Sequence, residues 1–418
     1  MSAFDKVIGY SYVKSEMLEI LDMLKNPEIY EKLGATLPSG FLLEGEPGLG
    51  KTLIAMAFIE ESGIKSYILR RSKETKDFIE EMNRVFEDAK RNAPAIILLD
   101  DMDKFATAEK NAEEFSVLQA NIDSVKNEKV FIIATVNYTK YIPHSLLRSG
   151  RFDRTIEILY PSRKDGLEIV KYYVGQKPIG DSVDMNDLAK MLSGKSCADL
   201  DVIINMAAIS ASHERSEKIE MKHLVNATLR DAYGIGGHRD LLSQRELEEV
   251  AYHEAGHAVV SDIINEGSVG IVSIARSSKT IRDGFMTRCT DYSRRPHLIL
   301  VSLGGKAAAE LKFGKVASGT FSDLSRASTQ VDESTKHTGI YGLANLGFGG
   351  ESVFQDARSE VVVTAELERY LFKAKEILAD NREFLEKVAL ELLEKETLLN
   401  SDIARIRATC TIAPAIIG

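Results

Sequence analysis

The sequence predicts a fold that is α/β plus mainly α, in which a parallel-sheet domain is followed by two mostly helical parts. Short apolar runs alternate with helical patterns over the first 160 residues, which is typical of a parallel sheet covered by helices on both faces. Residues 164–232 have a helical pattern throughout. After a glycine-rich segment the pattern is again helical, apart from one short β-like stretch.

The first domain, residues 1–160, is expected to form a sheet of short apolar strands. Helical patterns such as Phe78–Arg91 and Glu113–Val125 lie between most of them, and Pro161 breaks the alternation. The expected strands are Phe41–Leu43, Tyr67–Leu69, Ile96–Leu99, Val130–Ala134 and Thr155–Leu159.

A glycine-rich linker divides the rest of the chain. Residues 161–232 are predicted to form a helical subdomain, with Ser162 and Ser196 capping two of its helices. Glycines 234, 236 and 237 loosen the backbone, so we expect a linker over residues 233–246. The last domain, residues 247–418, is predicted to contain a helix over Arg245–Asn265, β-like stretches at Val269–Ile274 and Gly284–Arg288, and helices within Arg295–Thr338 and Ser359–Thr409.

Composition and charge limit the classes of protein to which the chain can belong. A length of 418 residues suggests about three domains, and 44% hydrophobic residues are enough to form sizeable cores. The net charge of −10 gives no overall electrostatic reason to expect nucleic-acid binding. The basic runs Arg70–Lys73 and Arg294–Arg295 are short and typical of solvated loops or partner contacts.

Cysteine usage and hydropathy favour a cytoplasmic location. The three cysteines, Cys197, Cys289 and Cys410, are scattered and odd in number, which suits a reducing compartment. No apolar run approaches the roughly 18 residues that would span a bilayer, and Met1 does not open a signal peptide. A membrane anchor upstream of Met1 in a longer native protein stays an open alternative.

Gly45–Thr52 matches the phosphate-binding pattern GxxxxGK[ST] and lies between an apolar strand and a helix. The glycines allow backbone N–H groups to converge on phosphate oxygens, Lys51 supplies a positive charge, and the Thr52 hydroxyl can bind Mg²⁺. A glycine turn that merely opens a helix is the structural alternative. The match and its context predict an ATP site.

Asp100 and Asp101 end the apolar run that begins at Ile96. Carboxylates at the tips of parallel strands lie at the edge of the sheet where ligands bind. We expect Asp100 to hold Mg²⁺ through water and Asp101 to polarise the attacking water. A polar strand end without a catalytic role is the alternative.

The segment from His253 to His257 has the sequence HEAGH on a predicted helix. Residues four apart lie on one face of a helix, so both imidazoles can bind a single Zn²⁺, while Glu254 can act as general base. Zinc lowers the pKa of a bound water toward about 7. Two packed histidines are the alternative, but the small residues Ala255 and Gly256 would let another element or substrate approach the helix closely.

A catalytic zinc needs a third protein ligand and one open position. Several downstream side chains offer a suitable atom, and spacing alone does not choose among them. They are Asp283, Asp291, His297, Glu310, Asp323 and Asp332.

These motifs together resemble one known family. Residues 4–232 resemble an AAA+ module, and the whole chain resembles the FtsH family of ATP-dependent zinc metalloproteases. The resemblance rests on the two motifs above and on further segments along the chain. They are Phe4, Val7–Gly9, Leu99–Asp101, Ala134–Asn137, Leu146–Arg154, Ser196–Leu200, Ala251–His257 and Leu303–Glu310.

The resemblance implies roles for further residues. Asn137 would be the sensor that orients the hydrolytic water, and Arg151 and Arg154 would be arginine fingers acting on a neighbouring subunit of a hexameric ring. Surface ion pairs are the alternative for both arginines. Asp323, in Ser318–Asp323, stands where the family has its third zinc ligand; a helix N-cap is the alternative. The nucleotide-binding residues expected are Ile8, Gly45, Pro47, Gly48, Leu49, Gly50, Lys51, Thr52, Leu53 and Asp100.

The sequence departs from the family pattern in two places. The second acid of the ATPase strand is usually glutamate, and Asp101 is one methylene shorter, which can slow hydrolysis. The family also has an aromatic–hydrophobic–glycine loop that grips unfolded chain. The corresponding stretch, Arg71–Phe78, is polar and charged, and Phe78 fits a helix core at least as well as a pore.

The sequence therefore predicts an ATP-dependent zinc endopeptidase of polypeptides, with Zn²⁺, ATP and Mg²⁺ as cofactors. It is expected to form a homo-oligomer, without nucleic-acid partners and without a membrane segment in this chain. One alternative is an ATP-driven remodelling or scaffold protein with a structural or weakly active zinc site. Another is a peptidase with a vestigial nucleotide domain, which the complete set of ATPase residues disfavours.

Overall fold

The structure, a computed structural model, describes residues 2–35, 38–107, 111–126, 128–148, 150–233, 243–275, 284–288, 295–314, 321–334 and 353–415. Contacts divide the chain into two compact units. The first is Met1–Tyr172 with Lys195–Asp201, and the second is Tyr173–Gly194 with Val202–Gly418. Most of the predicted linker lies outside the described residues, and the domain boundaries drawn from the sequence remain predictions.

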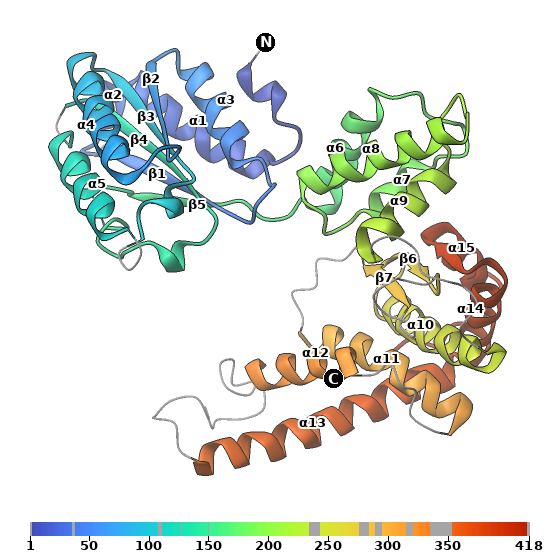
Figure 1. Ribbon diagram of the computed structural model, residues 1–418. Helices are drawn as coiled ribbons and strands as arrows, with labels where there is room; N and C mark the ends of the chain where they lie inside the picture. Colours follow the sequence, from blue (N-terminus) through green and yellow to red (C-terminus); the bar gives the residue numbers. More distant parts are fainter. Residues whose placement is uncertain are drawn as a thin grey trace. The chain divides into compact units, whose positions relative to one another are not determined.

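A parallel sheet of five strands forms the centre of the first unit, in the order β2-β3-β4-β1-β5 (Figure 1). All five strands predicted from apolar runs are confirmed, with ends shifted by a few residues, as is usual for element boundaries. Their bounds are β1 Gly40–Glu44, β2 Lys65–Arg70, β3 Ala95–Asp100, β4 Val130–Val136 and β5 Arg154–Glu157.

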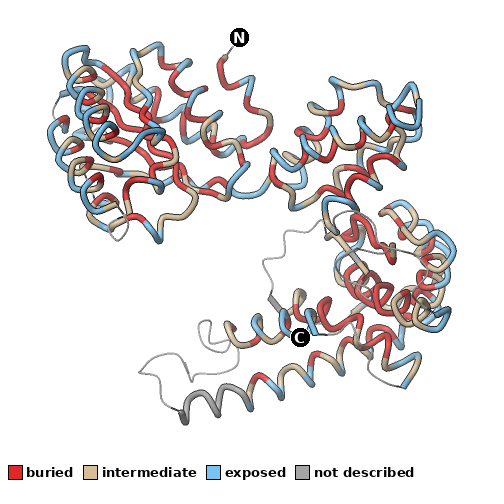
Figure 2. The backbone as a smooth tube through the Cα atoms, in the orientation of Figure 1, coloured by how far each residue is buried: buried red, intermediate tan, exposed pale blue. Residues whose placement is uncertain are grey.

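Helices cover both faces of this sheet. Successive strand residues point to opposite faces; Leu42 belongs to the core that α4 and α5 cover, whereas the Phe41 ring lies 5.2 Å from that of Phe58 in α3. The central strands β1, β3 and β4 are accordingly buried, whereas most residues of the edge strands β2 and β5 are partly or fully exposed (Figure 2). The helices are η1 Ala3–Lys6, α1 Ser11–Lys25, α2 Pro27–Glu31, α3 Lys51–Ser62, α4 Thr75–Arg91, η2 Met102–Lys104, α5 Ala112–Ser124 and η3 Thr139–Tyr141.

The sheet brings three chain segments to one edge. In the register of the parallel strands, Glu44 of β1 pairs with Val136 of β4, and Leu99 of β3 pairs with Ala134 of β4. The loop after β1, the acids after β3 and the residue after β4 therefore lie together, at the edge where ligands bind in open α/β sheets.

Four helices follow the sheet, as predicted. They are α6 Arg163–Val174, α7 Met185–Met191, α8 Cys197–His213 and α9 Met221–Tyr233. Both predicted caps are confirmed: the Asp165 N–H donates to Ser162 Oγ and the Asp199 N–H to Ser196 Oγ, each at 3.2 Å. These bonds satisfy N–H groups that a helix start leaves without an intrahelical partner.

The rest of the second unit is mostly helical, with a small antiparallel sheet of order β7-β6-β8. β8 was not predicted, because three residues between two helices carry no periodic signal; it is fixed by pairing with β6. The elements are α10 Gln244–Ile264, β6 Val269–Ser273, β7 Phe285–Arg288, α11 Arg295–Phe313, α12 Phe321–Glu333, α13 Val353–Asp380, α14 Arg382–Lys395, β8 Thr397–Leu399 and α15 Asn400–Arg407.

α10 is the central helix of this unit, and it is buried from Ala251 to Asp262. α11 approaches it so closely that a Cβ on Gly256 would lie 2.3 Å from the Gly304 carbonyl oxygen. The expectation that the small residues of the HEAGH segment allow a close neighbour is thus confirmed. α13 and α14 contribute residues such as Leu378 and Phe384 to the same core.

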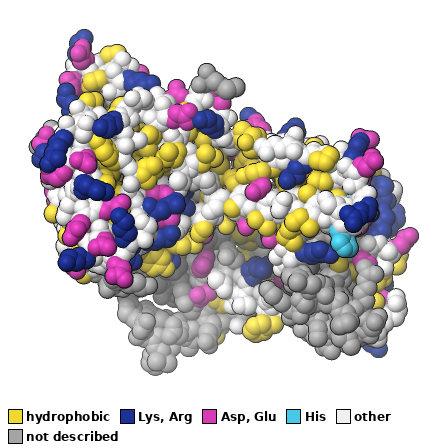
Figure 3. Space-filling view, turned by 45° about the horizontal axis from the view of Figure 1, so that its top comes forward, with side chains coloured by type: hydrophobic (Ala, Val, Ile, Leu, Met, Phe, Trp, Pro, Cys, Tyr) yellow, Lys and Arg dark blue, Asp and Glu magenta, His cyan; other side chains and the backbone are white. Residues whose placement is uncertain are grey.

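On the described part of the face in Figure 3, acidic and basic side chains are interspersed. The absence of a nucleic-acid partner stays a prediction. Among the helices described, none combines the length and the apolar character that crossing a membrane requires.

We predict that Gly256→Ala lowers the free energy of unfolding of the transition that includes α10 by about 1–3 kcal/mol, because the added methyl overpacks the helix contact. Gly166→Ala in α6 is the matched control, since nothing lies within 4 Å of the position that its methyl group would take. At position 166, replacing glycine by alanine should raise the free energy of unfolding by about 0.5–1 kcal/mol. Chemical denaturation followed by circular dichroism measures both; equal effects would contradict the close approach.

Candidate nucleotide site and metal centre

The loop after β1 has the backbone that a phosphate cradle needs. Gly48 and Gly50 have φ angles of +82° and +87°, a region that favours glycine, and α3 begins directly afterwards at Lys51. A Cβ on Gly45 would lie 2.4 Å from the carbonyl oxygen of Ile158. The N-terminal N–H groups of α3 are therefore presented at the sheet edge, where they can bind phosphate.

Lys51 is held inside this loop. Its Nζ donates to the carbonyl oxygens of Gly45 and Glu46, at 2.6 and 2.9 Å, and to Asn137 Oδ1 at 3.0 Å. Burial lowers the pKa of Lys51 from its ordinary value, although nearby carboxylates such as Asp101 oppose this effect. The ammonium group is positioned before any ligand arrives, as a β/γ-phosphate site requires.

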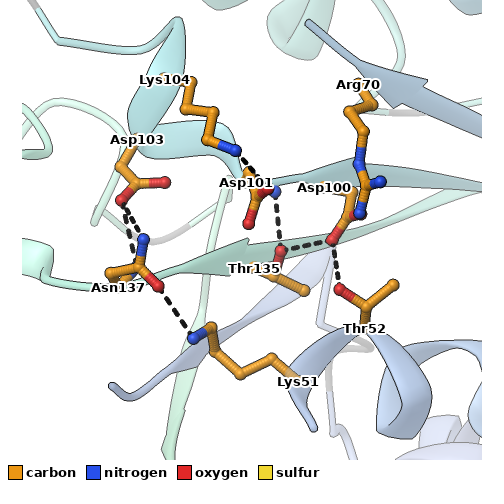
Figure 4. A network of polar contacts seen from close by, with 9 residues as sticks. All are labelled: Lys51, Thr52, Arg70, Asp100, Asp101, Asp103, Lys104, Thr135 and Asn137. Carbon is orange, nitrogen blue, oxygen red and sulfur yellow. Dashed lines mark hydrogen bonds and ion pairs between the residues drawn. The ribbon is translucent and has the colours of Figure 1, made fainter. Parts of the chain in front are cut away.

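Asp100 is buried and hydrogen-bonded on both oxygens (Figure 4). Its Oδ1 accepts from the hydroxyls of Thr52 and Thr135, each at 2.8 Å, and its Oδ2 pairs with Arg70. Burial raises the pKa of this carboxyl, but the hydrogen bonds outweigh it and hold the pKa below its ordinary value. An ionised carboxylate beside a threonine hydroxyl is a donor set that suits Mg²⁺.

Asp101 and Asn137, the two residues expected to act on the water, lie on the same side of these contacts (Figure 4). The Asp101 N–H donates to Thr135 Oγ1 at 2.8 Å, and its carboxylate pairs with Lys104 at 2.7 Å. Asn137 Nδ2 donates to Asp103 Oδ2 at 2.9 Å. The structure therefore brings together Lys51, Thr52, Asp100, Asp101 and Asn137 as predicted.

The other residues expected to bind the nucleotide differ in how far they are buried. Leu49 is buried, Pro47 is exposed, Ile8 is half-buried and the Leu53 side chain points largely to solvent. Their contacts with ATP remain predictions. Gly48, by contrast, accepts a 3.2 Å hydrogen bond on its carbonyl oxygen from the N–H of Ala198 at the start of α8.

Arg151 and Arg154 both form ion pairs within their own unit. Arg151 makes two hydrogen bonds to Asp123, at 2.9 and 2.7 Å, and its side chain is only 12% exposed. Arg154 lies 3.1 Å from Glu19, and 36% of its side chain is exposed. These are the ion pairs that the sequence left open as an alternative; action on a neighbouring subunit stays a proposal.

Phe78 is part of the core and is not a surface aromatic. It is fully buried in α4, with its ring 5.1 Å from that of Phe105. In the polar segment before it, Arg71 pairs with the buried Glu114 at 2.8 Å. The expectation that Phe78 fits a helix core is confirmed, so this side chain is not available to grip a polypeptide.

In the second unit, His253, His257 and Asp323 converge on one point. Their ligand atoms lie within 3.1 Å of one another: both Nε2 atoms approach Asp323 Oδ2, at 3.0 and 3.1 Å, and each other at 3.1 Å. Ligands of a tetrahedral zinc are about 3.3 Å apart when the bonds are about 2.0–2.1 Å long. The spacing fits a single Zn²⁺.

The tautomer of His257 explains why these atoms meet. The shortest contact of its Nδ1 is 2.7 Å to the carbonyl oxygen of Val301, which can only accept; this favours a proton on Nδ1, although the Gly305 N–H also approaches that atom, at 3.3 Å. In the neutral ring with this tautomer, Nε2 has a lone pair to offer, and it faces an Asp323 oxygen that also has only lone pairs. A cation between them makes this arrangement favourable, and the Val301 bond is the outer contact that orients a ligand histidine.

Glu254 lies beside the two imidazoles and is buried. Its Oε1 accepts a 3.2 Å hydrogen bond from the N–H of Gly284, the residue before β7. Burial raises the pKa of Glu254 above its ordinary value, while the histidines oppose this. A carboxylate with a raised pKa is a stronger proton acceptor, which suits a general base.

Among the described residues, Asp323 is the one that completes a metal-binding group with the two histidines. It lies in the first turn of α12 and not at its N-cap, which removes the structural alternative. Glu310 instead pairs with Lys306 and Lys375. Of the other candidates, Asp283 and Asp291 lie outside the described residues.

Several residues of these sites were missed by sequence reasoning. A Cβ on Gly305 would lie 2.5 Å from His257 Nε2, so this glycine makes room for the imidazoles; it lies in the Leu303–Glu310 segment, but spacing gave it no role. Gly284, Arg70 and Asp103 were also missed. Of these residues, only Asp103 could have been suspected from the sequence, because it is an acid two residues after Asp101.

Two protein families match the chain, each over one of these sites. The ATPase family associated with various cellular activities (AAA) matches residues 41–160, and Peptidase family M41 matches residues 240–406. The chain thus combines an AAA ATPase module with a metallopeptidase module.

Curated relatives extend over nearly the whole chain. It is 32% identical over 432 residues to an ATP-dependent zinc metalloprotease FtsH of Streptobacillus moniliformis, covering 96% of this chain and 63% of the relative. It is 32% identical over 426 residues to ATP-dependent zinc metalloprotease FtsH 2 of Sphaerobacter thermophilus, covering 94% and 64%. For an ATP-dependent zinc metalloprotease FtsH of Caldicellulosiruptor bescii the identity is 32% over 447 residues, covering 96% and 71%.

The chain belongs to the FtsH family of ATP-dependent zinc metalloproteases. It spans slightly less than two thirds of the length of the first two of these relatives.

We predict that Gly305→Ala weakens zinc binding by about 10- to 100-fold, because the methyl group displaces the imidazoles as loss of an outer contact would. Competition with a chromophoric chelator measures the affinity, and Gly166→Ala in α6 is the control that should keep wild-type affinity. Unchanged affinity in Gly305→Ala would show that the histidines do not hold the metal in this arrangement.

Proposed function

We propose that the chain is an ATP-dependent zinc endopeptidase that degrades polypeptides. The observation that carries the proposal is the convergence of His253, His257 and Asp323 within 3.1 Å, beside the buried carboxylate of Glu254. Two histidines and one carboxylate leave a fourth position free, as catalytic zinc sites do. The phosphate site in the same chain supplies the ATP hydrolysis on which the proposed peptidase depends.

The peptidase step uses the residues around the metal. Zinc, when bound by His253, His257 and Asp323, acts as a Lewis acid that lowers the pKa of water and polarises a peptide carbonyl. Glu254 accepts the proton of the attacking water and later passes it to the leaving amine. The Gly284 N–H holds one Glu254 oxygen, so the side chain keeps one orientation while it does so.

The ATPase step uses the sheet edge. Lys51 and the N–H groups of α3 bind the phosphates, while Thr52 and Asp100 provide the oxygen atoms for Mg²⁺. Asn137 and Asp101 orient the attacking water. Arg151 and Arg154 stabilise the developing charge in a neighbouring subunit, so hydrolysis requires a ring of subunits, which we propose to be hexameric. Both arginines must leave their present ion pairs to do this.

A second candidate is an ATP-driven remodelling protein with a structural or weakly active zinc site. The polar segment before α4 and the burial of Phe78 favour it, because they remove the aromatic grip expected for threading. In the endopeptidase proposal, ATP hydrolysis therefore acts through delivery or gating by other surfaces. A cytoplasmic location stays a prediction that rests on cysteine usage.

The direct test is ATP-stimulated cleavage of casein. We expect Glu254→Gln to reduce cleavage by at least about 100-fold, since the general base is lost while the zinc ligands remain. Glu248→Gln on the same helix is the matched control and should cleave normally. Zinc content measured on both variants confirms the metal; full activity of Glu254→Gln would rule out this chemistry.

Removal of the metal should separate the two activities. The zinc ligands and the phosphate site lie in different compact units, so a zinc chelator should abolish casein cleavage and leave more than about half of the ATP hydrolysis. Phosphate release measures the ATPase, and added Zn²⁺ should restore cleavage. Casein cleavage that survives complete removal of zinc would favour the remodelling candidate with a contaminating peptidase.

A further inference from the structure

We propose that Asp103 is a positioning residue of ATP hydrolysis, which holds the side-chain amide of Asn137 in the one orientation that serves the attacking water. The inference rests on the proposed ATPase function and deepens it. It concerns a carboxylate that neither the phosphate cradle nor the Mg²⁺ site uses.

The hydrogen bonds around Asn137 fix its amide chemically. Nδ2 and the backbone N–H both donate to Asp103 Oδ2, at 2.9 and 3.3 Å, while Oδ1 accepts from Lys51 Nζ at 3.0 Å. A carboxylate can only accept and an ammonium group can only donate, so exchange of the amide oxygen and nitrogen would leave two repulsive contacts. Asn137 therefore turns its carbonyl oxygen toward Lys51, the residue that binds the terminal phosphates.

This orientation determines what Asn137 can do. A carbonyl oxygen on the phosphate side accepts a hydrogen bond from the attacking water and aims a water lone pair at phosphorus. An NH₂ group there would donate to the water instead and occupy that lone pair. Together with Lys51, Asp103 thus selects between two functions of the same side chain.

The side chain of Asp103 has no other partner among the described residues. Its Oδ1 is buried without a hydrogen bond, and the adjacent Lys104 pairs with Asp101 (Figure 4). A buried acceptor without a partner is unfavourable, and such groups in native proteins call for an explanation. A residue that served only the stability of η2 would not direct its one bonded oxygen at the side chain and backbone of Asn137.

The test is a double-mutant cycle on ATP hydrolysis by the full chain. Asp103→Asn keeps the size of the side chain but adds a donor, so Lys51 alone still selects the orientation of the Asn137 amide. We expect kcat to fall by about 10- to 100-fold, with KM for ATP within about twofold of wild type. In an Asn137→Ala background, the same substitution should change kcat by less than about twofold, because there is no amide left to orient.

Two further variants complete the test. Asp103→Glu is acceptor-only like aspartate, so it should recover kcat to within about fivefold of wild type. Asp88→Asn, an exposed carboxylate in α4, is the control and should leave kcat unchanged. Thermal unfolding of every variant is measured alongside.

The outcomes separate this inference from the function on which it rests. A wild-type chain without ATPase activity, in the presence of Mg²⁺, overturns both. Wild-type activity together with an unchanged Asp103→Asn variant, or with an equal loss in both backgrounds, overturns the role of Asp103 and leaves the ATPase standing. If Asp103→Asn does not fold, an inactive but folded Asp103→Glu variant overturns the inference in its place.

Discussion

The metal centre depends on the close approach of α10 and α11. Gly256 and Gly304 let the two backbones meet where a single methyl group would clash, and Gly305 leaves room for the imidazoles. The same approach brings the carbonyl oxygen of Val301 to His257 Nδ1, a contact that orients the imidazole. Burial and ligand orientation thus follow from three glycines that carry no reactive group themselves.

In the candidate nucleotide site, the charged side chains are paired with polar or oppositely charged groups of the protein itself. Lys51, the Asp100 carboxylate and the Asn137 amide are hydrogen-bonded to neighbouring protein groups, which fix their positions at the edge of the sheet. Arg70 pairs with the carboxylate beside Thr52, at the point where a divalent cation would be expected. Binding of the cation therefore has to weaken or replace this ion pair.

The two sites belong to separate compact units, and each is built from elements of its own unit. Their combination in one chain is found in the FtsH family. Phe78 departs from the aromatic grip expected of a threading ring, because it is buried in the core. The ion pairs of Arg151 and Arg154 are contacts within one unit of a single chain.

Sequence by itself determined the strands of the first unit and the helix of the zinc motif, and it predicted most of the residues that the structure brings together at the two candidate sites. Apolar runs, a phosphate-binding pattern and two histidines four residues apart are local signals, because they depend on one helix or one strand and turn. The tertiary structure decided what depends on distant segments: the choice of Asp323 among the candidates that lie within the described residues, the pairing of β8 with β6, and the contact of Asp103 with Asn137. The spacing of residues along the chain does not determine which buried acceptor bonds to which donor, because such pairs form between distant segments that tertiary packing brings together.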